Sequence, residues 1–106
     1  MQGFGWLESL WATVSGRAAT RPEGSYTARL LAGGVDAVGR KVTEEATEVL
    51  MAAKDDAVAQ AAGQPRDAAP LAGEIGDLLY HTLVLCAERG LAPADVIAIL
   101  RKRHAA

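Results

Sequence analysis

Residues 35–53 read VDAVGRKVTEEATEVLMAA, and this stretch decides the fold class of the chain. Its apolar side chains recur every three or four residues, which places them on one face of a helix at about 100° per residue. A strand would instead alternate apolar and polar residues with a period of two. The segment therefore predicts a long helix that begins near Asp36 and continues beyond Asp56. The predicted core stripe consists of Val35, Val38, Val42, Ala46, Val49 and Ala53.

Start and stop signals for helices recur along the rest of the chain. Ser25 is a predicted N-cap, Gly90 a predicted C-terminal stop, and Pro93 fits a first helical turn. The segment 61–70 holds two prolines and a glycine and is predicted to be a loop. Four more helices follow from these patterns, over residues 4–16, 26–32, 71–89 and 93–102. We expect an all-α fold, a bundle of about four to five helices in a single domain over residues 1–106.

Composition narrows the function classes. The chain has 106 residues, half of them hydrophobic and 5% aromatic, with a formal net charge of −2. It shows no basic patch of the kind that nucleic-acid binding requires, and no apolar run of the ~20 residues that a membrane span needs. Cys86 is the single cysteine, so an internal disulfide is impossible. No signal peptide is evident. We therefore expect a cytoplasmic protein without nucleic-acid or membrane partners.

The predicted fourth helix is apolar on almost every side. Residues 78–87 read LLYHTLVLCA, with few polar side chains. A helix that is apolar all round is normally buried. A chain of this length has few ways to cover every side of one helix, so we expect an oligomer, most simply a twofold homodimer.

Acidic side chains form a band beside the predicted core stripe. On a helical wheel Glu45 lies about 60° from the stripe, Glu48 about 120° and Glu44 about 160°. Lys41 lies on the same side as these acids. Glu45 is therefore expected nearest the interior, and Glu44 furthest from it.

The fourth helix carries a second acidic pair. Glu74 and Asp77 are neighbours at i, i+3, and His81 follows one turn later. Clustered acids repel one another and call for a compensating cation. Ligands that are all oxygens suit Mg²⁺ or Mn²⁺ and argue against zinc. A merely solvated glutamate-rich face remains the alternative explanation.

Several motifs in order resemble one known family. Glu44-Glu45-Ala46-Thr47-Glu48, followed after 25 residues by Glu74-Ile75-Gly76-Asp77, resembles the EExxE…ExxD signature of the MazG-like all-α nucleotide pyrophosphohydrolases. The segments 21–31 (RPEGSYTARLL), 40–42 (RKV), 77–81 (DLLYH) and 90–103 are similar to the phosphoribosyl-ATP pyrophosphatase family within that group. The resemblance covers residues 17–103. Departures are Arg40 for lysine, Gly76 for alanine, and a 61–70 loop longer than expected.

The resemblance implies a dimeric, helical, Mg²⁺-dependent enzyme. Its reaction would be hydrolysis of phosphoribosyl-ATP to phosphoribosyl-AMP and pyrophosphate, the second step of histidine biosynthesis. The metal ligands would be Glu45, Glu48, Glu74 and Asp77. Glu44 would be a further ligand or the base that positions the attacking water, and Glu48 also belongs to the expected catalytic set.

Other residues would then contact the substrate. Lys41 would reach a phosphate or pair with Glu45. Arg21, Ser25 and Tyr26 would contact phosphate and ribose, although Ser25 also fits a helix cap and Tyr26 also fits the core. His81 would contact a phosphate or Asp77, or would be a buried, hydrogen-bonded histidine.

Three rival functions remain open at this point. A housekeeping nucleoside triphosphate pyrophosphohydrolase would carry the same acids, and the segment 21–31 favours phosphoribosyl-ATP over that alternative. A non-catalytic helical interaction module would need no metal. A di-iron carboxylate bundle requires Glu-x-x-His motifs, and the sequence contains none.

Overall fold

The computed structural model describes residues 3–105, and its regular structure there is entirely helical. Five helices follow in order: α1 (Trp6–Thr20), α2 (Tyr26–Ala32), α3 (Gly34–Ala61), α4 (Ala69–Arg89) and α5 (Pro93–His104). The predicted all-α class with four to five helices is confirmed. Within the described range, no helix is long and apolar enough to cross a membrane.

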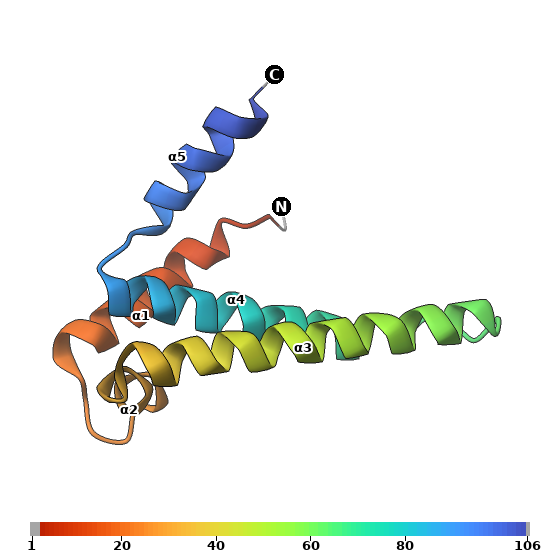
Figure 1. Ribbon diagram of the computed structural model, residues 1–106, viewed down its shortest axis with the longest axis horizontal. Helices are drawn as coiled ribbons and strands as arrows, with labels where there is room; N and C mark the ends of the chain where they lie inside the picture. The colour runs from red at the N-terminus through yellow and green to blue at the C-terminus, as the bar shows by residue number, and fades with distance from the viewer. Residues whose placement is uncertain (1–2, 106) are drawn as a thin grey trace.

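An antiparallel hairpin of α3 and α4 forms the centre of the molecule. Figure 1 shows the two helices side by side, with α2 beneath the start of α3 and α1 near the end of α4. The short connection over residues 62–68 forces α4 to return along α3. Residues far apart in sequence are therefore brought face to face along the hairpin.

Several helix ends differ from the sequence prediction. The first helix continues to Thr20 instead of ending at residue 16. It stops only where Arg21 adopts a left-handed conformation (φ 47°) and its backbone N–H donates to the Arg17 carbonyl. The fourth helix begins at Ala69, because Pro70 has a φ that suits the first turn. The Asp67 carboxylate accepts a hydrogen bond from the Ala69 backbone N–H, at 3.1 Å.

The remaining ends differ by a turn or less. The long helix begins at Gly34, two residues before Asp36, and ends at Ala61. The last helix continues to His104 instead of residue 102. The predicted 26–32 helix has the observed bounds.

The fully buried core is small and draws one side chain from each of the first four helices. Val14, Leu31, Val38 and Val84 form this cluster. The fifth helix contributes no buried residue. The core therefore holds α1 to α4 together and leaves α5 outside.

The buried face of α3 differs from the predicted stripe. Val35 is 48% exposed and Ala46 is also exposed, whereas Glu45 is buried. The residues of α3 that face α4 are spaced alternately by four and three positions, as expected where two helices pack along their length. These buried and half-buried residues are Val38, Val42, Glu45, Val49, Ala52, Asp56 and Ala59. This repeat places Glu45 inside the helix interface, where the wheel had placed Ala46.

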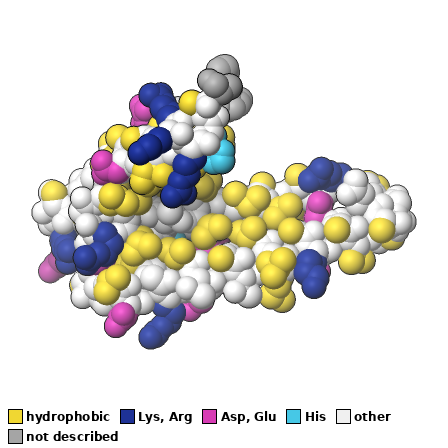
Figure 2. Space-filling view, turned by 45° about the horizontal axis from the view of Figure 1, so that its top comes forward, with side chains coloured by type: hydrophobic (Ala, Val, Ile, Leu, Met, Phe, Trp, Pro, Cys, Tyr) yellow, Lys and Arg dark blue, Asp and Glu magenta, His cyan; other side chains and the backbone are white. Residues whose placement is uncertain are grey.

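A single chain leaves apolar surface on α4 and α5 uncovered. Leu79 and Ile75 of α4 are 36% and 40% exposed, so one chain does not cover every side of this helix, and its burial by a second copy stays a prediction. In Figure 1, α5 projects away from the hairpin, and Figure 2 shows hydrophobic side chains spread over the body and the base of this projection. The exposed apolar residues of α5 are Val96, Ile97, Ile99 and Leu100.

The position of the core predicts that truncating two valines of α3 will change the free energy of unfolding by very different amounts. Val38→Ala should lower the free energy of unfolding by about 2 kcal/mol, because two buried methyl groups are lost and a cavity remains. Val58 is 69% exposed, so Val58→Ala should change it by less than about 0.5 kcal/mol. Urea denaturation with an unchanged m-value measures both, and equal losses would contradict this description of the core.

Candidate functional site

Three carboxylates converge between α3 and α4. Glu45 and Glu48 lie one turn apart on α3, and Glu74 faces them from α4. Each offers one oxygen, and these three oxygens lie within 4.8 Å of one another. We call these three side chains the carboxylate cluster. The antiparallel hairpin creates it, because 25 residues separate Glu48 from Glu74 in the sequence.

Two oxygens of this cluster are buried without a partner. Glu45 is 6% exposed and Glu74 is half-buried, while Glu48 is exposed. Glu45 Oε2 and Glu74 Oε2 have no hydrogen-bond partner among the described residues. A buried polar atom without a partner costs about 1–3 kcal/mol, and more if it is charged. The donor set, made only of oxygens, fits a hard divalent cation, and such a cation would satisfy both orphaned atoms.

The electrostatics of the cluster disfavour its negative charge. Burial raises the pKa of Glu45, and the nearby Glu48 carboxyl and the charge of Asp77 raise it further, while Lys41 partly offsets the effect. The Glu48 carboxyl raises the pKa of Glu74, with burial and the charges of Glu48, Glu45 and Asp77 adding to the effect. Both groups therefore hold protons more tightly than an ordinary glutamate, as like charges in a confined space should.

Asp77 lies beside the carboxylate cluster but outside it. It follows Glu74 by three residues on α4 and is exposed. Its charge acts on both Glu45 and Glu74. Three of the four predicted ligands are thus brought together, and the fourth stands at the exposed edge.

Lys41 pairs with Glu44 and not with Glu45. Its ammonium lies 3.2 Å from Glu44 Oε2, and this hydrogen bond raises the pKa of Lys41. Of the two predicted roles of Lys41, the pairing with Glu45 is not formed, because Glu45 turns into the helix interface, and the contact with a phosphate stays a prediction. Glu44 is about half exposed and is not one of the converging carboxylates.

His81 lies buried against Glu45 and faces protein atoms. Its Nδ1 donates to the Asp77 backbone carbonyl at 2.8 Å and lies 3.8 Å from Glu45 Oε1. Its Nε2 lies 2.9 Å from the Tyr26 hydroxyl. With 6% exposure, His81 has the arrangement of a buried, hydrogen-bonded histidine, and its contact to Asp77 is to the backbone only.

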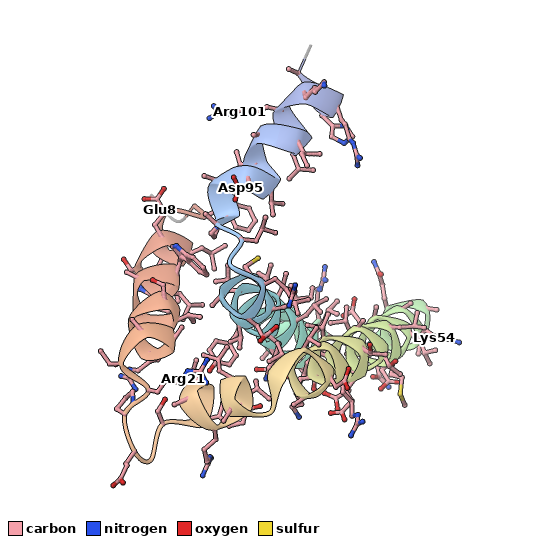
Figure 3. All side chains as sticks on the ribbon, turned by 60° about the vertical axis from the view of Figure 1, so that its left-hand side comes forward. Glu8, Arg21, Lys54, Asp95 and Arg101 are labelled. Carbon is pink, nitrogen blue, oxygen red and sulfur yellow. The ribbon has the colours of Figure 1, made fainter. Side chains whose placement is uncertain are left out.

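The segment between α1 and α3 holds three predicted substrate residues, of which Tyr26 reaches the site through His81. Ser25 caps α2, since its hydroxyl accepts a hydrogen bond from the Ala28 N–H at 3.2 Å. Tyr26 is 42% exposed, although its hydroxyl reaches His81. Arg21 is exposed, and Figure 3 shows it at the junction of α1 and α2. Its Nε donates to the Ala18 carbonyl at 3.4 Å.

A hollow of about 510 Å³ extends from the carboxylate cluster along the hairpin. Glu48 and Glu74 line it, and it continues to the loop that joins α3 to α4. There Arg66 pairs with Asp56 at 3.4 Å. The sequence analysis missed this extension because it treated residues 61–70 only as a loop. Asp55, seven residues after Glu48 and so on the same face, was the available signal.

Comparison with known proteins finds related sequences over nearly the whole chain. The model of the family described as phosphoribosyl-ATP pyrophosphohydrolase matches residues 7–104. A Deinococcus radiodurans protein named histidine biosynthesis bifunctional protein HisIE is 52% identical over 94% of this chain and 41% of its own length. A phosphoribosyl-ATP pyrophosphatase of Pelotomaculum thermopropionicum is 43% identical over 92% of this chain and 90% of its own.

The lengths of these relatives differ. The chain spans less than half of the bifunctional relatives, including one from Halalkalibacterium halodurans that is 46% identical over 95% of this chain and 43% of its own length. The match to the family model nevertheless extends over nearly every described residue and includes all three members of the carboxylate cluster. The chain therefore belongs to the phosphoribosyl-ATP pyrophosphohydrolase family.

Proposed function

We propose that this chain hydrolyses phosphoribosyl-ATP to phosphoribosyl-AMP and pyrophosphate, the second step of histidine biosynthesis, with Mg²⁺ as its cofactor. Family membership and the names of the relatives support this choice of substrate. The observation that supports the metal is the pair of buried oxygens without a partner on Glu45 and Glu74, two residues of the carboxylate cluster that come from different helices. Mn²⁺ has similar ligand preferences and would occupy the same place.

The chain's own residues have distinct parts in this proposal. Glu45, Glu48 and Glu74 hold the metal, and Asp77 joins them from the exposed edge. A bound Mg²⁺ would neutralise charge on the phosphates. The hollow of about 510 Å³ beside the cluster lies within the range of ligand pockets and would accept a nucleotide.

Residues at the rim would act on the substrate and on water. Lys41 and Arg21 would bind phosphate oxygens, and Glu44, outside the cluster, would orient the attacking water and accept its proton. The water oxygen then bonds to one phosphorus of the α–β anhydride, the bridging P–O bond breaks, and the electron pair leaves with the departing phosphate group. Ser25 orders the start of α2 and so contributes mainly to the placement of Tyr26.

We also propose a homodimer located in the cytoplasm. The exposed apolar residues of α4 and α5 would be more favourable if they were buried. A second apolar hollow of about 840 Å³ lies between α5 and the start of α1. A second copy of the chain would bury these surfaces. Sedimentation equilibrium should then give twice the chain mass of 11.1 kDa, and a monomer at micromolar concentrations would contradict the dimer.

Removing one ligand should abolish most of the activity. Glu48→Gln keeps the side-chain volume but removes a charge, and we expect pyrophosphate release from phosphoribosyl-ATP to fall by about tenfold or more. Asp36→Asn removes an exposed carboxylate at the start of α3 and should leave activity within about twofold. An activity of Glu48→Gln within threefold of the parent (~3×) at saturating Mg²⁺ would refute the ligand assignment. A preference for dCTP or dUTP would favour a housekeeping pyrophosphohydrolase.

Mg²⁺ should stabilise the fold, and more so at higher pH. Since the folded pKa of Glu45 and of Glu74 lies above the ordinary 4.5, the folded state binds more protons than the unfolded state just above that value. The contribution of these groups to stability therefore falls as pH rises through this window. Mg²⁺ reverses the loss by replacing the protons, and a hundredfold excess over Kd adds about 2.7 kcal/mol.

Thermal unfolding with and without Mg²⁺ at two pH values checks this. The Mg²⁺-induced rise in Tm should be larger at about pH 8 than at about pH 5. In Glu74→Gln the rise should shrink at both values, because one titrating ligand is gone. A rise that is independent of pH in the parent protein would count against the clustered carboxylates as the site.

A further inference from the structure

The side chains behind Glu45 form a chain of contacts across three helices, in which a hydrogen bond joins Tyr26 to His81 and a longer polar contact joins His81 to Glu45. Tyr26 comes from α2, His81 from α4 and Glu45 from α3. The Tyr26 hydroxyl meets His81 Nε2 at 2.9 Å, and His81 Nδ1 lies 3.8 Å from Glu45 Oε1. His81 and Glu45 are each 6% exposed, so these two side chains are shielded from solvent, whereas Tyr26 is 42% exposed.

The roles of the two ring nitrogens follow from their partners. A backbone carbonyl only accepts hydrogen bonds, so His81 Nδ1 carries the hydrogen that points to the Asp77 carbonyl. In the neutral ring Nε2 then accepts from the Tyr26 hydroxyl. Turning the ring over would replace both nitrogens by carbons and break both hydrogen bonds. The ring of His81 is therefore held in one orientation.

This orientation bears directly on the Glu45 carboxylate. The Nδ1 atom lies 3.8 Å from Oε1, although its hydrogen points to the Asp77 carbonyl, and the oxygen left without a partner is Oε2. We propose that Tyr26 and His81 are positioning residues, which hold Oε1 of Glu45 on one side so that Oε2 remains available to the metal. This inference rests on the proposed metal site and assigns neither residue a contact with the substrate.

Tyr80, which packs against the rings of Tyr26 and His81, supplies a matched control. The Tyr80 hydroxyl hydrogen-bonds to Thr27 and thereby also links α4 to α2. The Tyr80 ring stacks on Tyr26, with centroids 6.3 Å apart, and meets His81 edge-on at 5.0 Å. Its hydroxyl makes no contact with Glu45. Tyr80→Phe therefore removes a comparable inter-helix hydrogen bond without touching the proposed positioning chain.

The test is the affinity for Mn²⁺ in the absence of substrate, measured by electron paramagnetic resonance of the free ion. His81→Phe keeps a ring but loses both nitrogens, and Kd should rise about tenfold or more. His81→Asn retains an N–H donor near the Nδ1 position and should recover part of this loss. Tyr26→Phe should weaken Mn²⁺ binding by a smaller factor, because the ring of His81 stays but loses one anchor. Tyr80→Phe should leave Kd within about twofold while lowering Tm.

Each outcome decides the proposal. A parent protein that does not bind Mn²⁺ overturns the proposed metal site and this inference with it. Normal Mn²⁺ binding by His81→Phe and Tyr26→Phe overturns the positioning role alone, and points to substrate contact if activity is nevertheless lost. If His81→Phe does not fold, Tyr26→Phe decides. If Kd rises equally in Tyr26→Phe and Tyr80→Phe, both hydroxyls act only by linking α2 to α4, and the positioning role is overturned.

Discussion

The packing of α3 against α4 is the constraint on which the rest of the molecule depends. Two antiparallel helices in contact along their length meet through residues spaced alternately by four and three. On α3 this spacing includes Val38, Val42 and Val49, and it also includes Glu45. The interface therefore buries a carboxylate at a position that a stable core would give to an apolar side chain. The surroundings of Glu45 act in both directions, since Lys41 lowers the pKa of this buried carboxyl while Glu48 and Asp77 raise it.

Those surroundings compensate Glu45 only in part. His81 lies close to one of its oxygens, while the other oxygen and one from Glu74 are left without a partner. Such incomplete compensation lowers the stability of the fold without a ligand and makes ligand binding more favourable. Proteins commonly accept a local loss of stability where they carry out their chemistry. The carboxylate cluster is the one place within residues 3–105 where three potential metal ligands converge in this way.

The outer parts of the molecule are less constrained. The fifth helix adds nothing to the buried core, and its apolar residues lie open alongside those of α4. At the other end of the hairpin, α3 continues to Ala61 and encloses a hollow that begins at Glu48 and Glu74. The hairpin thus lies between an exposed apolar surface and the hollow beside the carboxylate cluster.

The sequence by itself determined the helical class, the order of the helices and the identity of the acids on α3 and α4. These features depend on local periodicity, on caps such as Ser25 and on the chemistry of carboxylates, all of which act within a few residues. The sequence could not give the exact buried face of α3. The packing of α4 against α3 decides that Glu45 is buried there and Ala46 is not. Only the tertiary structure decided that Lys41 pairs with Glu44, that Asp77 stays at the edge and that His81 lies beneath Glu45. Each of these contacts depends on the rotation of one helix against another, and that rotation is set by packing between residues distant in the chain.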